Sequence, residues 1–591
     1  MPNALPAWDL TDFYPSLTSD KCKKDQAKAL RDAQKFAKEY KGKIGKLSGK
    51  KLAEAIKAYE KLNDLLGKLA SYAQLNYALD CTDAAILQFY QNIHEHVNRC
   101  TSELLFFTLE LNAMKEADVK KKLGASAELA HYAPWIREVR AARKYQLSDE
   151  LEQYSHDKDV VEQSWIRLFD ETLAGLEFTI DKKTYSTAEV FDFMSSPKPE
   201  VRKKAAEEIS RVLKSKGSVF SLVTNTLAKS KEIDDRWRNY ARPISSRNMA
   251  NQVEDPVVDA LIGTVKDNYK NLSHRYYKWK AKQFDVKKMD WWDRNAPLPK
   301  QPETKYGWDE SVELVLDSYQ AFSPTLAKHG KTFFEKDWID VPPRPGKDSG
   351  AFAHPTVPSV HPYLLLNFQG KTRDVMTLAH ELGHGVHQVL AAKQGALMSD
   401  TPLTLAETAS VFGEMLTFKE LLRRETNEAK RQALIAGKVE DMLNTVVRQV
   451  AFCEFERMVH DERRAGEITP DRLGQIWLQV QKESLGPVFK FDDSYACFWS
   501  YIPHFIHSPF YVYAYAFGDC LVNSLYAVYE AEAAKGAKQA KAFEQKYIEM
   551  LQAGGTLRHK ELLKPFGLNA SKPDFWQKGL DVISGYIDEL K

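Results

Sequence analysis

The sequence predicts a mostly α-helical protein with a small β-sheet next to one of its central helices. Through much of the first half, apolar residues recur every three or four positions, the pattern of helices that bury one face. A short apolar run ending in glycine, at residues 363–370, is the best strand candidate. Shortly after it, residues 380–384 read HELGH, with two histidines at helical spacing.

The helical pattern is clearest in one long stripe of apolar side chains separated by Lys, Glu and Asp. Its members are Leu52, Ile56, Tyr59, Leu62, Leu66, Leu69, Tyr72 and Leu75. Similar periodicity runs through residues 104–111 and 201–213. We interpret these stripes as the packing faces of helices. The sequence has no repeat of fixed period that would indicate a solenoid.

Two segments interrupt the helical texture. Residues 285–302 combine Trp291 and Trp292 with three prolines and predict an irregular, aromatic-rich region. Residues 341–346 (VPPRPG) form a second break. Beyond it, the apolar run from Tyr363 to Gln369 predicts a strand that leads into the HELGH helix.

Composition and charge narrow the class of protein. Lys and Arg number 83 against 81 Asp and Glu, so the net charge of +2 provides no electrostatic basis for a nucleic-acid or anionic-membrane partner. Six scattered cysteines without a CxxC pair are typical of reduced thiols in a cytosolic protein. The first ten residues have no basic segment followed by an apolar run, and no stretch is long enough to span a bilayer. We therefore expect a cytoplasmic protein without a signal peptide.

The HELGH sequence predicts a catalytic zinc site. His380 and His384 are four residues apart, so both imidazoles lie on one helix face and can reach a single ion. Glu381 is rotated about 100° away by helix geometry. It can therefore address a metal-activated water as a general base, which is the arrangement of HExxH metalloproteases. The flanking apolar residues would bury such a helix.

Catalytic zinc needs a third protein ligand. The metzincin pattern is excluded, because it requires Gly at position 387 and His at 390, where this chain has His387 and Leu390. We expect a carboxylate from the next helix, with Glu407 as the third ligand and Glu414, seven residues later on the same face, supporting the site. The alternative for Glu407 is a capping box with Thr404.

His387 lies on the same face one turn beyond His384. The helix rise carries it about 10 Å from His380, so we expect a supporting or surface histidine and not a ligand.

The sequence resembles peptidase family M3, the thimet oligopeptidase-like zinc metallopeptidases, and most closely the oligoendopeptidase F branch. The matching stretches span essentially the whole chain and are densest from about residue 346 to 518. They are residues 8–14 (WDLTDFY), 366–368 (LNF), 377–384 (TLAHELGH), 406–410 (AETAS), 502–505 (IPHF), 510–515 (FYVYAY) and 573–576 (PDFW).

This resemblance implies a nearly all-helical ellipsoid split by a deep channel, with zinc on its floor. It implies that His380, His384 and Glu407 hold one zinc ion per chain and that Glu381 is the catalytic base. We expect an N-terminal helical region at residues 1–190 and a catalytic region at 191–591, which together could form one body around the channel.

The resemblance also implies a His and Tyr pair that faces the scissile carbonyl. His504 and Tyr515 match this pair best, and Tyr511 is a second candidate. Thimet oligopeptidase has a longer, glycine-rich stretch between these residues, whereas this chain has His507-Ser508-Pro509. That departure leaves the choice of tyrosine open. Packing in a core is the alternative for this aromatic run, and we favour it for Tyr513 and Phe517.

The expected function is hydrolysis of internal peptide bonds in short oligopeptides. Zinc would polarise the carbonyl and activate water, Glu381 would take the proton and pass it to the leaving amine, and His504 with Tyr515 would stabilise the oxyanion. The strand from Tyr363 to Gln369 could hold the substrate backbone by edge pairing. A carboxypeptidase or dipeptidyl carboxypeptidase of the same chemistry is one alternative. A non-catalytic, zinc-containing peptide-binding helical protein is another. The intact Glu381 argues against the latter, since a structural zinc site has no use for a base.

Overall fold

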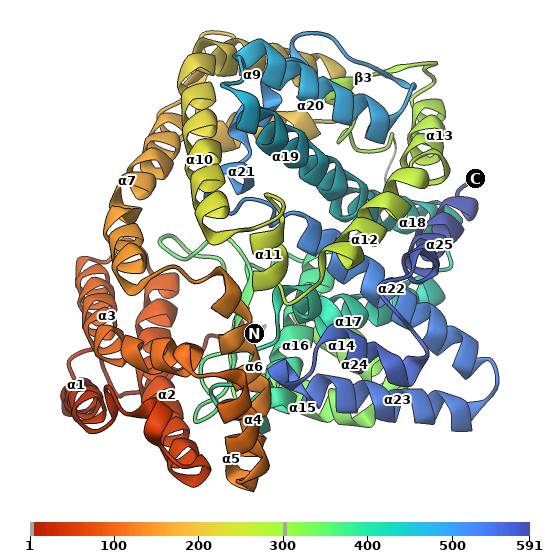
Figure 1. Cartoon of the computed structure of the whole chain (residues 1–591). Coiled ribbons are helices and arrows are strands. Elements are labelled where there is room, and N and C mark those ends of the chain that lie inside the picture. The colour runs from red at the N-terminus through yellow and green to blue at the C-terminus, as the bar shows by residue number, and fades with distance from the viewer. Residues whose placement is uncertain (1–4, 300–303) are drawn as a thin grey trace. The chain divides into compact units, whose positions relative to one another are not determined.

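The computed structural model of the chain describes residues 5–299 and 304–591 (Figure 1). It is mostly helical, with a few short strands, which confirms the predicted fold class. The first four residues of the N-terminus and the last three of the aromatic-rich segment at 285–302 lie outside the described residues. The rest of that segment holds only a two-residue strand, Met289–Asp290, and a 3-10 turn, Trp291–Asp293.

The chain folds into two compact units, each assembled from three separate segments. Unit 1 contains Met1–Lys144, Thr304–Arg424 and Val528–Gly567. Unit 2 contains Tyr145–Glu303, Glu425–Ala527 and Leu568–Lys591. The expected division at residue 190 and the expected channel stay predictions.

The main elements of unit 1 are α1 (Asp20–Tyr40), α2 (Gly49–Leu79), α3 (Ala84–Ala113), α4 (Glu116–Gly124), α5 (Ala127–His131), α6 (Ala133–Ala141), α14 (Trp308–Phe322), α15 (Pro324–Glu335), β4 (Ile339–Asp340), β5 (Phe352–His354), β6 (Tyr363–Leu365), α16 (Thr372–Ala391), α17 (Leu403–Arg424), α23 (Ala537–Gln552) and α24 (His559–Leu563).

The main elements of unit 2 are α7 (Asp149–Ala174), β1 (Phe178–Ile180), β2 (Lys183–Tyr185), α8 (Thr187–Asp192), α9 (Pro199–Ser215), α10 (Gly217–Arg238), α11 (Ser245–Ala250), α12 (Asp255–Asp267), α13 (Arg275–Gln283), β3 (Met289–Asp290), α18 (Glu428–Thr445), α19 (Val447–Ala465), α20 (Pro470–Leu485), β7 (Phe489–Lys490), α21 (His504–His507) and α25 (Pro573–Asp588). Helix α22 (Tyr513–Ala533) begins in unit 2, and the boundary with unit 1 falls within it.

The first helices of unit 1 form where the apolar stripes predicted them. Helix α2 covers the whole stripe from Leu52 to Leu75 and starts where the Ser48 hydroxyl accepts a hydrogen bond from the Lys51 amide, 3.2 Å. Helices α1, α2 and α3 pack against one another (Figure 1). Their shared core includes Phe13 and extends to Tyr363 of β6, with ring centroids 5.7 Å apart. The N-terminal helices therefore support the strand that precedes the metal helix.

A three-stranded sheet lies beside α16, as predicted. Its order is β4-β6-β5, with β6 parallel to β4 and antiparallel to β5. The predicted strand from Tyr363 to Gln369 is shorter as a regular strand, but Leu366 and Phe368 continue to donate backbone hydrogen bonds to residues 340 and 341. Because β6 is the middle strand, our expectation that it could pair with substrate through a free edge is wrong. The two edges of this sheet belong to β4 and β5.

A tight turn leads from this sheet into α16. Gly370 adopts a φ of +82°, and a Cβ there would lie 2.8 Å from the Tyr306 carbonyl oxygen, so only glycine fits. The Asp374 carboxylate accepts hydrogen bonds from the backbone amides of Gln369 and Lys371, at 2.8 and 3.0 Å. This cap fixes the start of the helix. Gly395, with a φ of +83°, follows the 3-10 turn after α16, and α17 begins just beyond Pro402.

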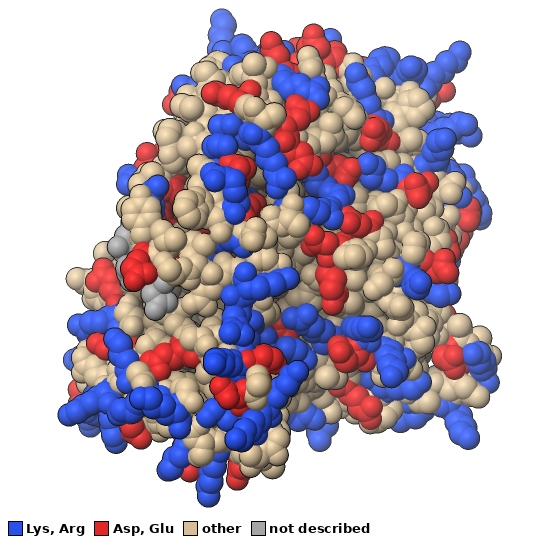
Figure 2. All heavy atoms as spheres, in the orientation of Figure 1, with Lys and Arg blue, Asp and Glu red and all other residues tan. Residues whose placement is uncertain are grey.

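The charged side chains and the cysteines agree with the balanced charge and the free thiols expected from the sequence. Blue and red side chains are intermixed over the face seen in Figure 2. All six cysteines carry free thiols. Within residues 5–299 and 304–591, no helix combines the length and apolar character needed to cross a bilayer.

Candidate metal centre and catalytic residues

Helices α16 and α17 cross in close contact at Gly383. A Cβ at this position would lie 2.5 Å from the Ala409 carbonyl oxygen and 2.6 Å from the Ser410 Cα. Any larger residue would force the two helices apart. Because the backbones approach so closely here, a side chain from the first turns of α17 can reach the histidines of α16.

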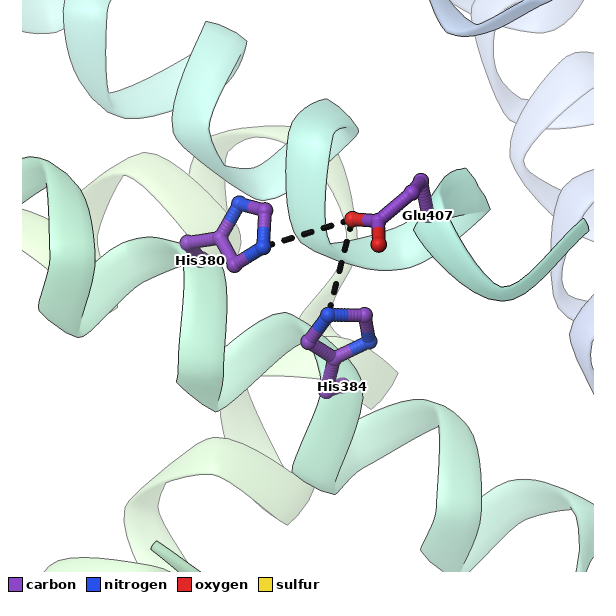
Figure 3. A group of neighbouring side chains, drawn as sticks. All are labelled: His380, His384 and Glu407. Atoms are coloured by element: carbon purple, nitrogen blue, oxygen red, sulfur yellow. Dashed lines mark ion pairs between the residues drawn. The ribbon is translucent and has the colours of Figure 1, made fainter. Parts of the chain in front are cut away.

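Three side chains converge at this crossing. His380 and His384 come from α16 and Glu407 from α17, and all three point toward one another (Figure 3). The Glu407 Oε2 atom lies 3.3 Å from His380 Nε2 and 3.5 Å from His384 Nε2. Among the residues that the structure describes, this is the one group of three or more His, Cys, Asp or Glu side chains spaced to hold a metal ion.

The donor set fits zinc. Ligand atoms about 2.0–2.1 Å from a tetrahedral zinc ion lie about 3.3–3.4 Å apart, close to the two Nε2–Oε2 distances. Two imidazoles and one carboxylate are also the ligand types of a catalytic zinc site that keeps one position open.

The ionisable side chains at the crossing of α16 and α17 shift one another's pKa values. Burial lowers the pKa of His384 to about 4, against the opposing charge of Glu407, so this imidazole is neutral at pH 7. Burial alone would raise the pKa of Glu407, but hydrogen bonding to His380 and the charge of His384 lower it to about 2. Burial likewise opposes protonation of His380, yet its bonds to Glu407 and Glu414 raise its pKa to about 10. The His380 ring thus faces a carboxylate on each nitrogen.

Neighbouring groups orient the three side chains. Ser410 Oγ donates a hydrogen bond to Glu407 Oε2 at 2.7 Å. Glu414 Oε2 lies 3.3 Å from His380 Nδ1, which is where a carboxylate fixes the tautomer of a ligating histidine. The Tyr319 hydroxyl donates to the carbonyl oxygen of Ala379 at 2.7 Å, next to His380 in α16. The Glu407 carboxylate contacts both histidines and Ser410, as expected for a ligand and not for a helix cap.

Glu381 lies beside this group. It is 7% exposed, and a backbone hydrogen bond links its carboxylate to Ala353 of the edge strand β5. Burial raises the pKa of Glu381 to about 7, with the charge of Glu407 adding to the shift and His380 opposing it. A carboxylate with a pKa near neutrality is suited to accept and return a proton.

His387 lies outside the group of three side chains, and the supporting role expected for it stays a prediction. It is buried, and burial together with the neighbouring His384 lowers its pKa to about 4, while a backbone hydrogen bond to Ala406 opposes the shift. His384 also forms a backbone hydrogen bond to Ala406. The two histidines therefore tie α16 to the start of α17.

The predicted His and Tyr residues cluster in unit 2. His504 Nε2 lies 3.3 Å from the Tyr515 hydroxyl, and the ring of Tyr511 stacks on His504 with centroids 6.0 Å apart. The Tyr511 and Tyr515 rings meet edge to face at 5.2 Å. All three side chains are half-buried, whereas Tyr513 and Phe517 are fully buried. The packing role favoured for Tyr513 and Phe517 agrees with this burial.

Hydrogen bonds from other parts of unit 2 hold the turn that joins His504 to Tyr515. Phe510 adopts a φ of +60°, unusual for a bulky residue, and its amide donates a 2.7 Å hydrogen bond to the buried carboxylate of Glu456. Arg247 Nε donates to the Pro509 carbonyl oxygen at 3.1 Å, and Asn251 donates to the Tyr513 hydroxyl at 2.8 Å. The surroundings thus keep the turn in a strained conformation.

Several of these supporting residues were not predicted from the sequence. Ser410 could have been found, because it lies three residues after Glu407 and so shares its helix face. Tyr319, Glu456 and Ala353 carried no local signal, since each contacts a residue far away in the chain.

A helix-borne HExxH sequence with a carboxylate on the following helix defines a class of peptidases. The profile of Peptidase family M3 matches residues 192–582, and that of Oligopeptidase F matches residues 110–178. The chain belongs to peptidase family M3, in its oligoendopeptidase F branch.

Related proteins share both length and fold with this chain. It is 26% identical to oligopeptidase PepF of Bacillus subtilis (strain 168), over an alignment that covers 99% of this chain and 86% of that protein. A crystal structure from Chlamydophila abortus has a TM-score of 0.86 at 23% identity, covering 99% of this chain and 97% of the other. Oligoendopeptidase F from Enterococcus faecium has a TM-score of 0.71 at 19% identity, with coverage of 96% and 98%.

Proposed function

We propose that the protein is a zinc-dependent oligoendopeptidase that hydrolyses internal bonds of short peptides in the cytoplasm. The convergence of His380, His384 and Glu407 at tetrahedral spacing is the observation that carries the proposal. Membership of peptidase family M3 supports the peptidase part of it.

The ligand set would hold one zinc ion per chain. Zinc, when bound, would polarise the peptide carbonyl and activate a water molecule. Ser410 and Glu414 would keep Glu407 and His380 in the orientation that binding requires.

The chain's own residues would carry the proton and the developing charge. Glu381 accepts the proton of the attacking water and then delivers it to the leaving amine. A hydroxyl or imidazole donor aimed at the carbonyl oxygen stabilises the negative charge that appears there during attack. His504 and Tyr515, with Tyr511 as the second candidate, are the donors we assign to this role.

The edge strand β5 offers a place for the peptide backbone. Its residues Phe352–His354 are half-buried and pair only with β6 in the described sheet, and the Ala353 backbone is bonded to Glu381. An extended peptide that adds to this edge would lie next to the proposed base. This assignment replaces the edge pairing first expected of β6.

We assign the chemistry to residues 191–591, because this region contains all the proposed catalytic and metal-binding residues. Residues 1–190 would form the N-terminal helical region. Their role would be structural, since they hold β6 through the shared core.

A peptide-cleavage assay with metal control tests the proposal. The purified protein should cut a mixed peptide library at internal bonds, lose activity in a strong chelator and regain it with added zinc. Mass spectrometry locates the cut bonds. Loss of only one or two C-terminal residues, abolished by C-terminal amidation, would indicate the carboxypeptidase alternative. Stoichiometric zinc without any cleavage would indicate a peptide-binding protein.

A further inference from the structure

Two arginines of unit 2, one of them close to His504, form no ion pair with the described residues. Arg448 lies in the first turn of α19, and Arg294 follows the 3-10 turn Trp291–Asp293. Both side chains remain half-buried and partly accessible. Within the described part of the chain, neither guanidinium lies within 4.0 Å of an Asp or Glu oxygen.

The nearby carboxylates already have cationic partners. Glu440 lies 2.7 Å from the Nζ atom of Lys280, whose side chain is fully buried. Asp293 lies 2.8 Å from Arg202, whose side chain is 2% exposed. Each of these two ion pairs is neutral by itself. The charges of Arg294 and Arg448 therefore remain as a local excess of positive charge.

The hydrogen bonds of the two guanidinium groups are also incomplete. Arg448 contacts the Tyr501 hydroxyl at 3.5 Å and packs over the Phe452 ring at 5.0 Å, but its buried Nε atom has no acceptor. Arg294 donates through Nε to Asn295 at 3.2 Å. A guanidinium has five N–H donors in a planar fork, so most of this donor capacity is unused.

Such an arrangement favours an anion. Burial, followed by the charge of Arg294, lowers the pKa of Arg448, so the two guanidinium groups lie within electrostatic reach of each other. Burial opposes the charge of Arg294 as well, but nearby tyrosines and Glu440 raise its pKa. Two half-buried cations without an anionic partner are stabilised when a counter-charge binds next to them. A carboxylate would balance the positive charge and accept hydrogen bonds from the planar guanidinium group.

The position of Arg448 relates the two arginines to the residues that we propose for catalysis. Arg448 is close enough to His504 to lower the pKa of that histidine, after the larger effect of burial. Tyr501, the partner of Arg448, precedes His504 by three residues. A group held by Arg448 would therefore lie near the residues that we assign to the oxyanion.

We propose that Arg448 and Arg294 form a carboxylate-binding subsite for the peptide substrate. The inference rests on the proposed peptidase function and deepens it. The carboxylate is either the C-terminal α-carboxylate of a short peptide or the side chain of an Asp or Glu residue. Either source would make the enzyme select peptides that place an anion at a set distance from the cleaved bond.

Arg448→Met tests the subsite, because methionine retains an unbranched, apolar stem and removes the charge. Arg457→Met is the matched control on the same helix, since Arg457 is paired with Asp259 and Glu454. Three versions of one cleaved peptide serve as substrates: the free acid, its C-terminal amide, and a form with Asn and Gln in place of Asp and Glu. KM, kcat and thermal stability are measured for each protein.

Loss of a charged hydrogen-bonded pair should raise KM by about ten- to hundredfold on peptides that carry the carboxylate. The peptide that lacks it should bind the wild type and Arg448→Met about equally, within roughly threefold, and this peptide identifies the source of the anion. Arg448→Lys keeps the charge without the planar guanidinium. Its KM on peptides that carry the carboxylate should therefore lie between the values of the wild type and Arg448→Met. Arg457→Met should leave the preference unchanged.

Equal losses on all three peptides, or no loss on any, would overturn the subsite. If Arg448→Met is unstable, Arg448→Lys and Arg294→Met provide the same comparison. Failure of the proposed function would look different: the wild type would cleave none of the peptides. Calorimetric binding of the three peptides to the wild type and Arg294→Met would then still test the subsite, and absence of any preference for the carboxylate would contradict it.

Discussion

At the scale of single residues, the metal centre depends on how neighbours orient each ligand. Glu407 receives a hydrogen bond from Ser410, and His380 faces Glu414 through its second ring nitrogen. These contacts leave the metal-facing atoms Nε2 and Oε2 converging on one point. The two glutamates of α17 therefore have distinct positions, one toward both histidines and one behind a single histidine.

Glu407→Ala should weaken zinc binding far more than Glu414→Ala. The first change removes a ligand atom, whereas the second removes a support for His380, which typically costs about 10–100-fold in metal affinity. Competition with a chelator of known affinity measures both constants. A larger loss for Glu414→Ala would reverse the assignment of the two residues.

Tyr515→Phe should lower kcat by about 10²–10³ with little change in KM, since the oxyanion forms only on the way to the transition state. The Tyr515 hydroxyl is the one that meets His504. Tyr511→Phe is the control, and melting temperatures of both variants separate chemistry from packing. If Tyr511→Phe carries the kcat loss instead, Tyr511 is the oxyanion donor. If neither variant loses kcat, the aromatic run serves packing alone.

At the scale of elements, the crossing of α16 and α17 brings the ligands together. Gly383 lets the two backbones touch, and the Tyr319 hydroxyl reaches the Ala379 carbonyl in the same region. A Cβ at Gly413 of α17 would lie 2.1 Å from that hydroxyl, so a second glycine makes room for Tyr319. We therefore expect zinc binding to depend on the spacing of the two helices as well as on the proposed ligands.

Gly383→Ala should weaken zinc binding and lower the melting temperature. A methyl group there meets backbone atoms that cannot rotate away, and overpacking of this kind typically costs about 1–3 kcal/mol. Gly437→Ala is the control, because that exposed helical glycine has open space around it. Alanine at position 437 should be neutral or slightly stabilising. Unchanged zinc affinity in Gly383→Ala would mean that the crossing tolerates separation.

The elements differ in how far the sequence predicts them. Helices α2 and α16 were predictable, because their apolar stripes and capping residues are local. Strands β4 and β5 were not, since each has only two or three residues and pairs with distant β6. For the same reason the sequence did not reveal that β6 is the central strand. That Arg294 and Arg448 have no Asp or Glu partner among the described residues was also beyond sequence reasoning, because ion pairing is a property of the folded state.

At the scale of the whole molecule, unit 1 depends on segments that are far apart in the chain. Trp8 and Phe13 pack in the same core as Tyr363 of β6, which directly precedes the metal helix. This core spans the proposed boundary at residue 190. We therefore expect the region to which we assign the chemistry to depend on the N-terminal helices for its stability.

Residues 191–591 produced alone should lack a cooperative thermal transition and bind an apolar dye, because the Tyr363 face of the sheet would be exposed. Differential scanning calorimetry and dye fluorescence measure this. Co-production with residues 1–190 should restore the transition, which controls for a general defect of the shorter chain. A cooperative, zinc-binding fragment 191–591 would instead establish an autonomous catalytic region.

The central claim is that Glu381 activates water beside a zinc ion held by its neighbours. Zinc content and peptide turnover of Glu381→Gln, measured on the same preparation, test it most directly. Glutamine has nearly the same shape but cannot accept the proton. We expect one zinc ion per chain, as in the wild type, and a kcat lower by about 10²–10⁴. Turnover within about tenfold of the wild type at full zinc content would contradict the claim.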